Sequence, residues 1–338
     1  MITETASDHR RGLEIVPETE TARSHEAKFL HLLDEFLEEQ VERFEPEVSE
    51  FVVACLEAGG KRIRPTLLSR TAYSPEIVFP DIVKAAAVME LVHLATLVHD
   101  DVLDEAMLRR GNVTLFSDQG ASVAVLVGDA LFSHALKLAS EFPTNEVCSW
   151  VSEATRRTCA GEIRQTFHRG KLDLSLEQYY RIIELKTAEF FRVSCLLGAF
   201  LGGFDESYCK AASGFGLRLG VAYQLYDDLA DIFGDELCLG KTLGTDWANR
   251  KPTLPLILLL RDMDSSAAEQ LWSSQETSVR QIKRMILQRD VFGTCVKRVR
   301  TELVAAEKVL APFANLSPVP HLLEAVQYME SKLTELDD

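Results

Sequence analysis

The sequence predicts an all-α protein built as a single domain. Apolar residues recur at helical spacing along nearly the whole chain, as in KFLHLLDEFLEEQVERF from residue 28, and alternating β-branched stretches are nearly absent. No Gly/Ser-rich linker or break in composition divides the chain. An antiparallel bundle of helices joined by short polar turns is the simplest architecture that agrees with these observations.

The expected helices follow one another along the chain. Residues 1–26 are polar and mostly acidic and are expected to form a mobile tail, followed by one domain at 27–338. The stretch 80–103 is apolar nearly all round, which is typical of a helix in the middle of a bundle. Further apolar stretches predict helices at 121–140, 147–165, 176–201, 208–232, 254–260, 267–287, 291–310 and 321–336.

Composition excludes several classes of function. The formal net charge is −16, so no global positive field attracts nucleic acid or an anionic membrane, and an anionic substrate would need local cations or bridging metal. The seven cysteines form no CxxC or CxxH pair, which is typical of reduced thiols in a cytoplasmic protein. The chain shows no signal peptide and no apolar run of the about 20 residues that span a bilayer, so we expect a soluble, cytoplasmic protein.

Two aspartate clusters interrupt apolar stretches. Both read D-D-x-x-D, and they comprise Asp100, Asp101 and Asp104, and Asp227, Asp228 and Asp231. The first and last aspartates of each cluster share one helix face, where their charges repel unless a cation neutralises them. A solvated helix end is the alternative, but the apolar flanks and the repeated pattern favour Mg²⁺ shared with a substrate diphosphate.

Basic residues accompany both clusters. They are Lys61 and Arg64 in GGKRIRP, Arg109 and Arg110 after the first cluster, Lys186 in a helix, and Lys241 and Lys251 after the second cluster. Arginine forks match phosphate oxygens, and lysine acts as a point charge. Each alone is more often a surface charge, but in an acidic chain their association with the aspartates favours an anion site.

These motifs resemble those of the trans-type polyprenyl diphosphate synthases, the head-to-tail chain-elongating enzymes of isoprenoid synthesis. The resemblance extends from about residue 29 to about residue 310 and rests on GGKRIRP, HLATLVHDDVLDEAMLRRG, LKTAEFF, YQLYDDLADIFG and GKTLGTDWANRKPTLP, in the family's order. A lone DDxxD is weak, whereas five ordered motifs are specific. The resemblance implies antiparallel helices of the isoprenoid synthase type around a deep central cavity, and a homodimer.

The resemblance also implies residue roles. About three Mg²⁺ ions would be held by Asp100, Asp101, Asp104, Asp227, Asp228 and Asp231. The allylic diphosphate would be bound by Arg109, Lys186, Thr187, Gln224, Lys241 and Lys251. The diphosphate of isopentenyl diphosphate would be bound by Lys61, Arg64, His93 and Arg110, although His93 alone would more often be a core histidine. Asp100, Asp101, Asp104, Asp227, Asp228 and Lys186 would act in catalysis, and Asp246 would support a lysine or the metal.

The implied reaction is chain elongation. Metal and cations would stabilise the leaving diphosphate, so that the allylic C–O bond ionises and the isopentenyl double bond attacks the carbocation. A proton would then be lost to the released diphosphate, and apolar walls would exclude water.

Product length is predicted from the residues before the first cluster, where short-chain members of the family carry an aromatic plug. Here they are Ala95 and Thr96, which predicts products of about twenty carbons or more. The alternative is that Ala95 is small for helix packing and that Met89 or Phe132 closes the cavity.

The chain departs from the family at Asn249-Arg250-Lys251, where glycine usually precedes the lysine. Arg250 would either add a phosphate ligand or change how the loop closes.

Three other functions remain as alternatives. A class I terpene cyclase usually replaces the second DDxxD and lacks GGKRIRP. A non-catalytic subunit of a heteromeric synthase tends to lose aspartates, whereas all six are present here. A purely structural helical scaffold does not explain the paired acids and cations.

Overall fold

The structure is a computed structural model that describes residues 18–58, 60–73, 80–236, 243–274 and 276–336. Its helices are α1 (Glu18–Val41), α2 (Pro46–Glu57), α3 (Ile63–Thr71), α4 (Pro80–Leu103), α5 (Leu115–Gln119), α6 (Ala121–Ser140), α7 (Glu146–His168), α8 (Leu176–Ile183), α9 (Glu189–Leu201), α10 (Glu206–Phe233), α12 (Thr245–Ala248), α13 (Leu254–Arg261), α14 (Ser265–Ser273), α15 (Val279–Gln288), α16 (Val291–Leu310) and α17 (Pro318–Glu335). A π-helix, η1 (Glu184–Ala188), joins α8 to α9, a 3₁₀ turn, η2 (Ala311–Phe313), follows α16, and two-residue strands β1 (Leu108–Arg109) and β2 (Asn112–Val113) form a hairpin. The all-α prediction is confirmed.

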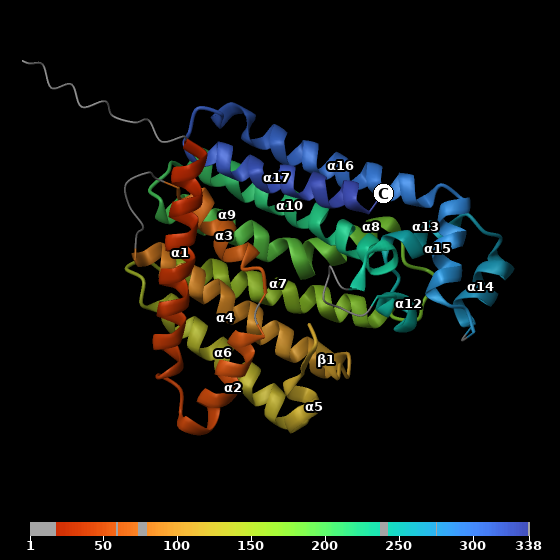
Figure 1. Cartoon of the computed structure of the whole chain (residues 1–338), viewed down its shortest axis with the longest axis horizontal. Coiled ribbons are helices and arrows are strands. Elements are labelled where there is room, and N and C mark those ends of the chain that lie inside the picture. The colour runs from red at the N-terminus through yellow and green to blue at the C-terminus, as the bar shows by residue number, and fades with distance from the viewer. Residues whose placement is uncertain (1–17, 59, 74–79, 237–242, 275, 337–338) are drawn as a thin grey trace, which may run out of the picture.

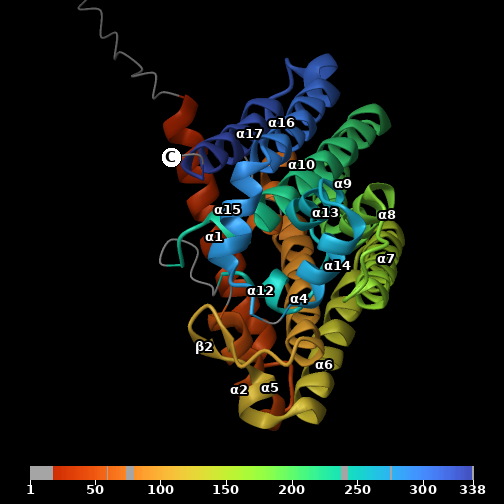
Figure 2. The same ribbon diagram turned by 90° about the vertical axis from the view of Figure 1, so that its right-hand side faces the viewer.

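The long helices are stacked across the molecule. Figures 1 and 2 show α16 and α17 on one side, α10 and α9 in the middle, and α4 and α6 toward the other side. The apolar core has two parts, one centred on α10 and α16 and one centred on α4 and α6. Helix α9 contributes to both, since Phe191 packs in the first and Phe190 in the second. This sandwiching explains why the sequence of α9 is apolar nearly all round.

Local signals in the sequence start several of these helices. Ser175 and Gln178 form a capping box at the start of α8, and Asp205 accepts a 2.8 Å hydrogen bond from the Tyr208 amide at the start of α10. Such caps satisfy amides that lack a partner within the helix. They fix the entry of the chain into the two segments that carry Lys186 and the second aspartate cluster.

The structure differs from the sequence prediction at three helices. Helix α1 begins at Glu18 rather than at residue 27, because Glu26 pairs with Arg70 of α3 at 2.7 Å and ties this part of α1 to the bundle; residues 1–17 lie outside the described residues. The expected helix 176–201 contains the π-helix η1. The expected helix 267–287 is two helices, because Ser278 and Gln281 form a capping box that starts α15 anew.

Two helices, α4 and α6, are long and apolar enough to cross a membrane by length and composition alone. In α4, 72% of the apolar window is buried inside the molecule, which is typical of a core helix. In α6 only 33% of the window is buried. Helix α6 therefore presents apolar surface that the described part of this chain does not cover.

Candidate active site

The first aspartate cluster lies at the C-terminal end of α4 and is surrounded by cations. Asp101 accepts hydrogen bonds of 2.9 and 3.0 Å from Nε of Arg109, whose Nη2 lies 2.8 Å from Oδ1. Asp100 lies 3.8 Å from Nζ of Lys186. Burial raises the pKa of Asp100 to about 6 even though Lys186 acts to lower it. This carboxyl therefore lies where one more positive charge would stabilise its ionised form.

Asp104, the last residue of this cluster, is held by two cations from distant segments. Its Oδ1 lies 2.5 Å from Nη2 of Arg169, and its Oδ2 lies 2.8 Å from Nζ of Lys251. Burial acts to raise the pKa of Asp104, but Lys251 and Arg169 outweigh it and hold the pKa below its usual value. Asp104 is thus the point where the ends of α4 and α7 meet the segment after α12.

The hairpin β1–β2 directs Arg109 and Arg110 to different partners. Its two-residue turn is Arg110-Gly111, with φ of 51° and 80°, as a type I′ turn requires. Arg109 turns to Asp101, whereas Nη1 of Arg110 donates to the Ala58 carbonyl at 3.3 Å. The Arg110 guanidinium covers Gly60, where a Cβ would lie 2.6 Å from it. The hairpin therefore joins the first aspartate cluster to the GGKRIRP segment.

The π-helix η1 presents Lys186 and Thr187 side by side. Lys186 bonds Glu162 and Gln165 of α7, the latter at 2.8 Å. Thr187 donates a 2.7 Å hydrogen bond to the Gln224 side chain of α10. The wider turn of a π-helix is a common device at functional sites. Two neighbouring residues of η1 thus reach the two halves of the site.

Close packing at a glycine makes this arrangement possible. A Cβ on Gly161 of α7 would lie 2.6 Å from the backbone nitrogen of Lys186. Since real Cβ atoms do not approach so closely, only glycine lets α7 and η1 lie at this separation.

The second aspartate cluster lies in the last two turns of α10. Asp228 is 3% exposed and accepts hydrogen bonds from Gln224 at 2.8 Å and from the Tyr179 hydroxyl at 2.5 Å. Burial raises the pKa of Asp228 to about 6, although both hydrogen bonds act to lower it. Thr187, Gln224 and Asp228 therefore form one relay of hydrogen bonds from η1 to the second cluster.

Asp231 holds the segment that follows. Its carboxylate accepts hydrogen bonds from the Thr245 hydroxyl at 3.0 Å and from the Asp246 amide at 3.1 Å. Burial, followed by the charges of Asp231, Asp228 and Asp227, raises the pKa of Asp246 well above its usual value. The two clusters, Lys251 and Asp246 thus lie in one electrostatic neighbourhood.

A separate group of cations lies around His93 of α4. Burial lowers the pKa of His93, and Arg64, Arg109 and Arg110 lower it further, so the imidazole is neutral. Arg64 packs over the Phe191 ring at 5.2 Å, and its buried Nε has no hydrogen-bond partner among the described residues. A buried guanidinium donor without an acceptor is costly, and an anionic ligand would satisfy it.

Several sequence predictions are not settled by these contacts. Lys61 is exposed, and Lys241 lies outside the described residues. Ala95 is 3% exposed and packs in the core cluster that also contains Met89 and the partly buried Phe132. Thr96 is half-buried one turn before Asp100 and hydrogen-bonds the His93 carbonyl at 2.7 Å.

The Arg250 side chain lies over two tryptophan rings. Its guanidinium carbon lies 4.2 Å from the Trp247 ring centre and 5.8 Å from that of Trp272. Its backbone φ is 51°, in the left-handed region that glycine adopts most easily. The loop therefore adopts at Arg250 a conformation that suits glycine, and the role of Arg250 stays a prediction.

Sequence reasoning missed three groups that contact the clusters or Lys186. Tyr179, Arg169 and Glu162 bond Asp228, Asp104 and Lys186, respectively. Their spacing from the clusters along the chain carries no signal, because packing of α7 and α8 against η1 and α10 brings them together.

The donor set fits Mg²⁺. Carboxylates lie near the ends of α4 and α10, and burial and repulsion by neighbouring acids raise the pKa of Asp100, Asp228 and Asp246. Hard divalent cations prefer such oxygen ligands. Among the residues that the structure describes, no three acidic, histidine or cysteine side chains converge at metal-binding distance, because Asp101 and Asp104 face arginine and lysine instead.

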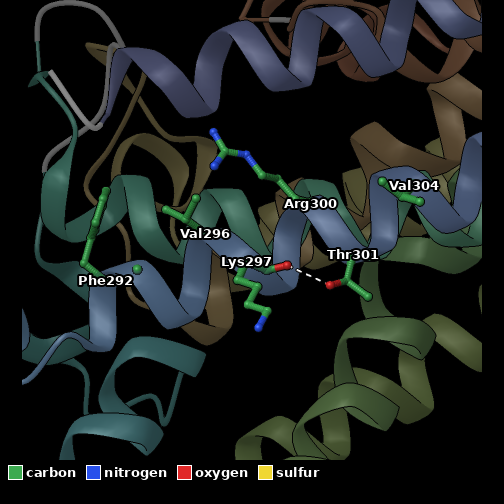
Figure 3. A pocket seen from close by; sticks show the side chains of 7 residues that line it. Phe292, Val296, Lys297, Arg300, Thr301 and Val304 are labelled. Atoms are coloured by element: carbon green, nitrogen blue, oxygen red, sulfur yellow. Dashed lines mark hydrogen bonds between the residues drawn. The ribbon is translucent and has the colours of Figure 1, made fainter.

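A hollow of about 490 Å³ lies elsewhere, along α16 (Figure 3). It is lined by Phe292, Gly293, Val296, Lys297, Arg300, Thr301 and Val304. None of these residues contributes to the site above, and the predicted deep central cavity stays a prediction.

The helices are arranged as in the isoprenoid synthase fold, which solved structures of prenyl synthases share. A decaprenyl diphosphate synthase from Rhodobacter capsulatus superposes with a TM-score of 0.83 at 27% identity, over 95% of this chain and 99% of that one. A polyprenyl synthase from Caulobacter crescentus, complexed with calcium and isoprenyl diphosphate, gives 0.81 at 30% identity, over 92% and 95%. The protein is a prenyltransferase.

The sequence match specifies the family. Residues 45–288 match the family model described as polyprenyl synthetase, and the chain belongs to that family. It is 34% identical to octaprenyl diphosphate synthase of Haemophilus influenzae over 66% of this chain and 68% of the relative. It is also 34% identical to heptaprenyl diphosphate synthase component 2 of Bacillus subtilis, over 69% and 67%. Identity to geranylgeranyl diphosphate synthase of Mycobacterium tuberculosis is 36%, over 63% and 62%.

Proposed function

We propose that the protein transfers an allylic prenyl group from its diphosphate onto isopentenyl diphosphate, in a Mg²⁺-dependent reaction that gives an all-trans polyprenyl diphosphate. One observation carries this proposal. Neighbouring residues of η1 join the two aspartate clusters, since Lys186 lies 3.8 Å from Asp100 and Thr187 reaches Asp228 through Gln224. A single diphosphate between the clusters would lie near the aspartates of both, which would bind it through Mg²⁺, and near Lys186 and Thr187 of η1.

The metal would be held by Asp100, Asp101, Asp104, Asp227 and Asp228, with Asp231 acting through the loop that it holds. Bound Mg²⁺ would neutralise charge on the diphosphate and make it a better leaving group. Lys186, Thr187, Gln224 and Lys251 would then orient the same diphosphate by hydrogen bonds and charge. Arg109 would bind it when released from Asp101, and Lys241 is proposed for the same role.

The second substrate would bind at the separate group of cations. Arg64, with its unsatisfied Nε, is the best-supported ligand for the diphosphate of isopentenyl diphosphate. Arg110, which the hairpin holds over Gly60, and the neutral His93 lie in the same neighbourhood, and Lys61 precedes them. Two separate anion sites would orient the double bond toward the allylic carbon.

We propose products of about twenty carbons or more, because neither Ala95 nor Thr96 is the bulky plug that stops elongation early. Relatives named octaprenyl and heptaprenyl synthases support long products, and a relative named geranylgeranyl synthase marks the lower end. The test is Ala95→Phe, which should shorten the product. An unchanged product length would mean that other residues form the floor of the cavity.

We propose a homodimer formed through α6 and α7. Val125 and Leu126 on α6 are 40% and 66% exposed, and Ile163 and Phe167 on α7 are 54% and 68% exposed. Monomers rarely leave so many large apolar side chains in water. Light scattering should give twice the chain mass, and Leu126→Glu should give monomers. A wild-type monomer that pairs only with a different subunit would favour a heteromeric synthase, as the component 2 relative suggests.

We also propose that the protein acts in the cytoplasm, because the more apolar of its two long apolar helices, α4, is buried in the core. Cell fractionation tests this, and recovery in the membrane pellet alone would contradict it.

The reaction is tested by incubating the purified protein with Mg²⁺, labelled isopentenyl diphosphate and each allylic diphosphate in turn. Polyprenyl diphosphates should form, and Asp100→Asn or Asp228→Asn should lower turnover by about a hundredfold or more. Asp118→Asn, in the exposed helix α5, is the matched control and should turn over normally. A cyclised hydrocarbon product would favour a terpene cyclase, and normal turnover of Asp228→Asn would overturn the metal assignment.

A further inference from the structure

Arg250 packs against two tryptophan side chains beside the site. Its side chain lies against the rings of Trp247 and Trp272, which are 5.7 Å apart and nearly perpendicular. Its Nη1 donates to the Trp247 carbonyl at 3.3 Å, and Nη2 donates to the Ser274 carbonyl. Both tryptophans are at most 5% exposed. Two donors of the guanidinium thus link α12 to the segment just after α14.

The backbone of Arg250 is tied to the end of α7. The Gly170 amide donates to the Arg250 carbonyl at 2.8 Å, and the Gly170 carbonyl accepts a 2.8 Å hydrogen bond from Nε1 of Trp272. Both the amide and the carbonyl of Gly170 are thus bonded, to Arg250 and to Trp272 respectively.

The two cations that hold Asp104 are the chain neighbours of these two residues. Arg169 precedes Gly170, Lys251 follows Arg250, and both side chains bond the Asp104 carboxylate, at 2.5 and 2.8 Å. The backbone hydrogen bond between Gly170 and Arg250 therefore links the two chain segments that carry these cations.

We propose that Arg250, Trp247 and Trp272 form a clamp that positions Lys251 and Arg169 at Asp104, so that Arg250 is a positioning residue for the allylic diphosphate. The inference rests on the proposed function only for its kinetic consequence. Where glycine leaves the loop before the lysine free to adopt several conformations, this chain places an arginine in the left-handed conformation and holds it with two aromatic rings.

An alternative hypothesis is that Arg250 binds phosphate directly, and the two hypotheses predict different effects of substitution. Lysine would offer a phosphate the same positive charge without the guanidinium fork, so Arg250→Lys would keep part of a direct phosphate contact. The clamp needs the planar guanidinium, which stacks and donates at two positions at once. It also needs Trp272, which would have no part in binding phosphate through Arg250.

The first experiment needs no substrate. Hydrogen exchange of the ligand-free full chain is followed by mass spectrometry in peptides that cover 164–172 and 245–253. In Arg250→Gly, exchange in both peptides should be about tenfold faster than in the wild type, and Trp272→Phe should accelerate the peptide that contains Gly170. Asn249→Ala, at an exposed neighbouring position, should change neither peptide. Unchanged exchange in Arg250→Gly would overturn the proposal.

The second experiment measures steady-state kinetics with geranyl diphosphate and isopentenyl diphosphate. Arg250→Gly and Arg250→Lys should both raise the KM for the allylic substrate about fivefold or more, with the KM for isopentenyl diphosphate within about twofold. Full rescue by lysine would contradict the clamp. If the wild-type enzyme fails to turn over, the proposed function fails, while the exchange experiment still decides whether the clamp exists.

Discussion

Replacing Tyr179 with phenylalanine removes one oxygen atom from the support of the second aspartate cluster. The Tyr179 hydroxyl donates to Oδ2 of Asp228 at 2.5 Å, and the side chain is 3% exposed. Burial and the neighbouring Asp228 raise the pKa of Tyr179, so its O–H stays a donor throughout any practical assay range. The only other donor to this oxygen recorded for the described residues is the Leu254 amide, at 3.4 Å.

The size of the effect follows from the chemistry of that hydrogen bond. Hydrogen bonds to charged groups contribute about 1.5–3 kcal/mol. We expect the lower end, because Gln224 still holds the other Asp228 oxygen at 2.8 Å. A loss of about 1.5 kcal/mol in transition-state stabilisation corresponds to about a tenfold drop in kcat/KM.

The assay is initial-rate prenyl transfer with varied allylic diphosphate, and circular dichroism checks the fold. Tyr180→Phe is the matched control, since among the described residues its hydroxyl takes part in one hydrogen bond, accepted from Arg298 at 3.4 Å. Its kcat/KM should stay within about twofold of the wild type. Equal losses in both variants, or no loss in Tyr179→Phe, would refute the assignment of Tyr179 to Asp228.

Three further predictions follow from packing and charge. Gly161→Ala, whose Cβ would lie 2.6 Å from the π-helix backbone, should lower kcat more than tenfold by displacing Lys186, whereas Gly214→Ala meets only a valine methyl at 3.3 Å and should keep activity; equal rates would contradict the packing argument. Arg64→Met should raise the KM for isopentenyl diphosphate about tenfold or more, and thermal unfolding should show no loss of stability because it removes a buried, unsatisfied cation. Hydrogen bonds from Lys84 and Lys137 lower the pKa of Glu141 to about 2, so its stabilisation is present above the unfolded pKa of about 4.3 and is lost as pH falls through about 2. Because this side chain is 42% exposed, Glu141→Gln should cost only about 0.5 kcal/mol at pH 7 and less at pH 3 in urea unfolding, and an equal cost at both pH values would contradict the assignment.

The parts of the site that were predictable from the sequence are those encoded by short-range spacing. Asp100 and Asp104 lie one turn apart in or after a helix, and the apolar pattern of that helix predicts its burial. The ordered basic motifs likewise predict that Lys186 and Lys251 lie near aspartates, and the structure brings both to the first cluster.

The rest depends on packing that periodicity does not encode. Arg169 lies at the end of α7 in an ordinary polar stretch, and only the fold brings it to Asp104. The π-helix that turns Lys186 toward Asp100 reads as continuous α-helix in the sequence. The sequence shows Arg250 as a departure from a glycine position, but only the fold brings Trp247 and Trp272 to it.

The central claim, that the two aspartate clusters form one site for metal and diphosphate, is tested most directly by calorimetric titration of the protein with inorganic diphosphate, with and without Mg²⁺. We predict binding that requires Mg²⁺ and that weakens about tenfold or more in both Asp104→Asn and Asp228→Asn, but not in Asp118→Asn. Binding that is equally strong without Mg²⁺, or that survives unchanged in Asp228→Asn, would contradict it.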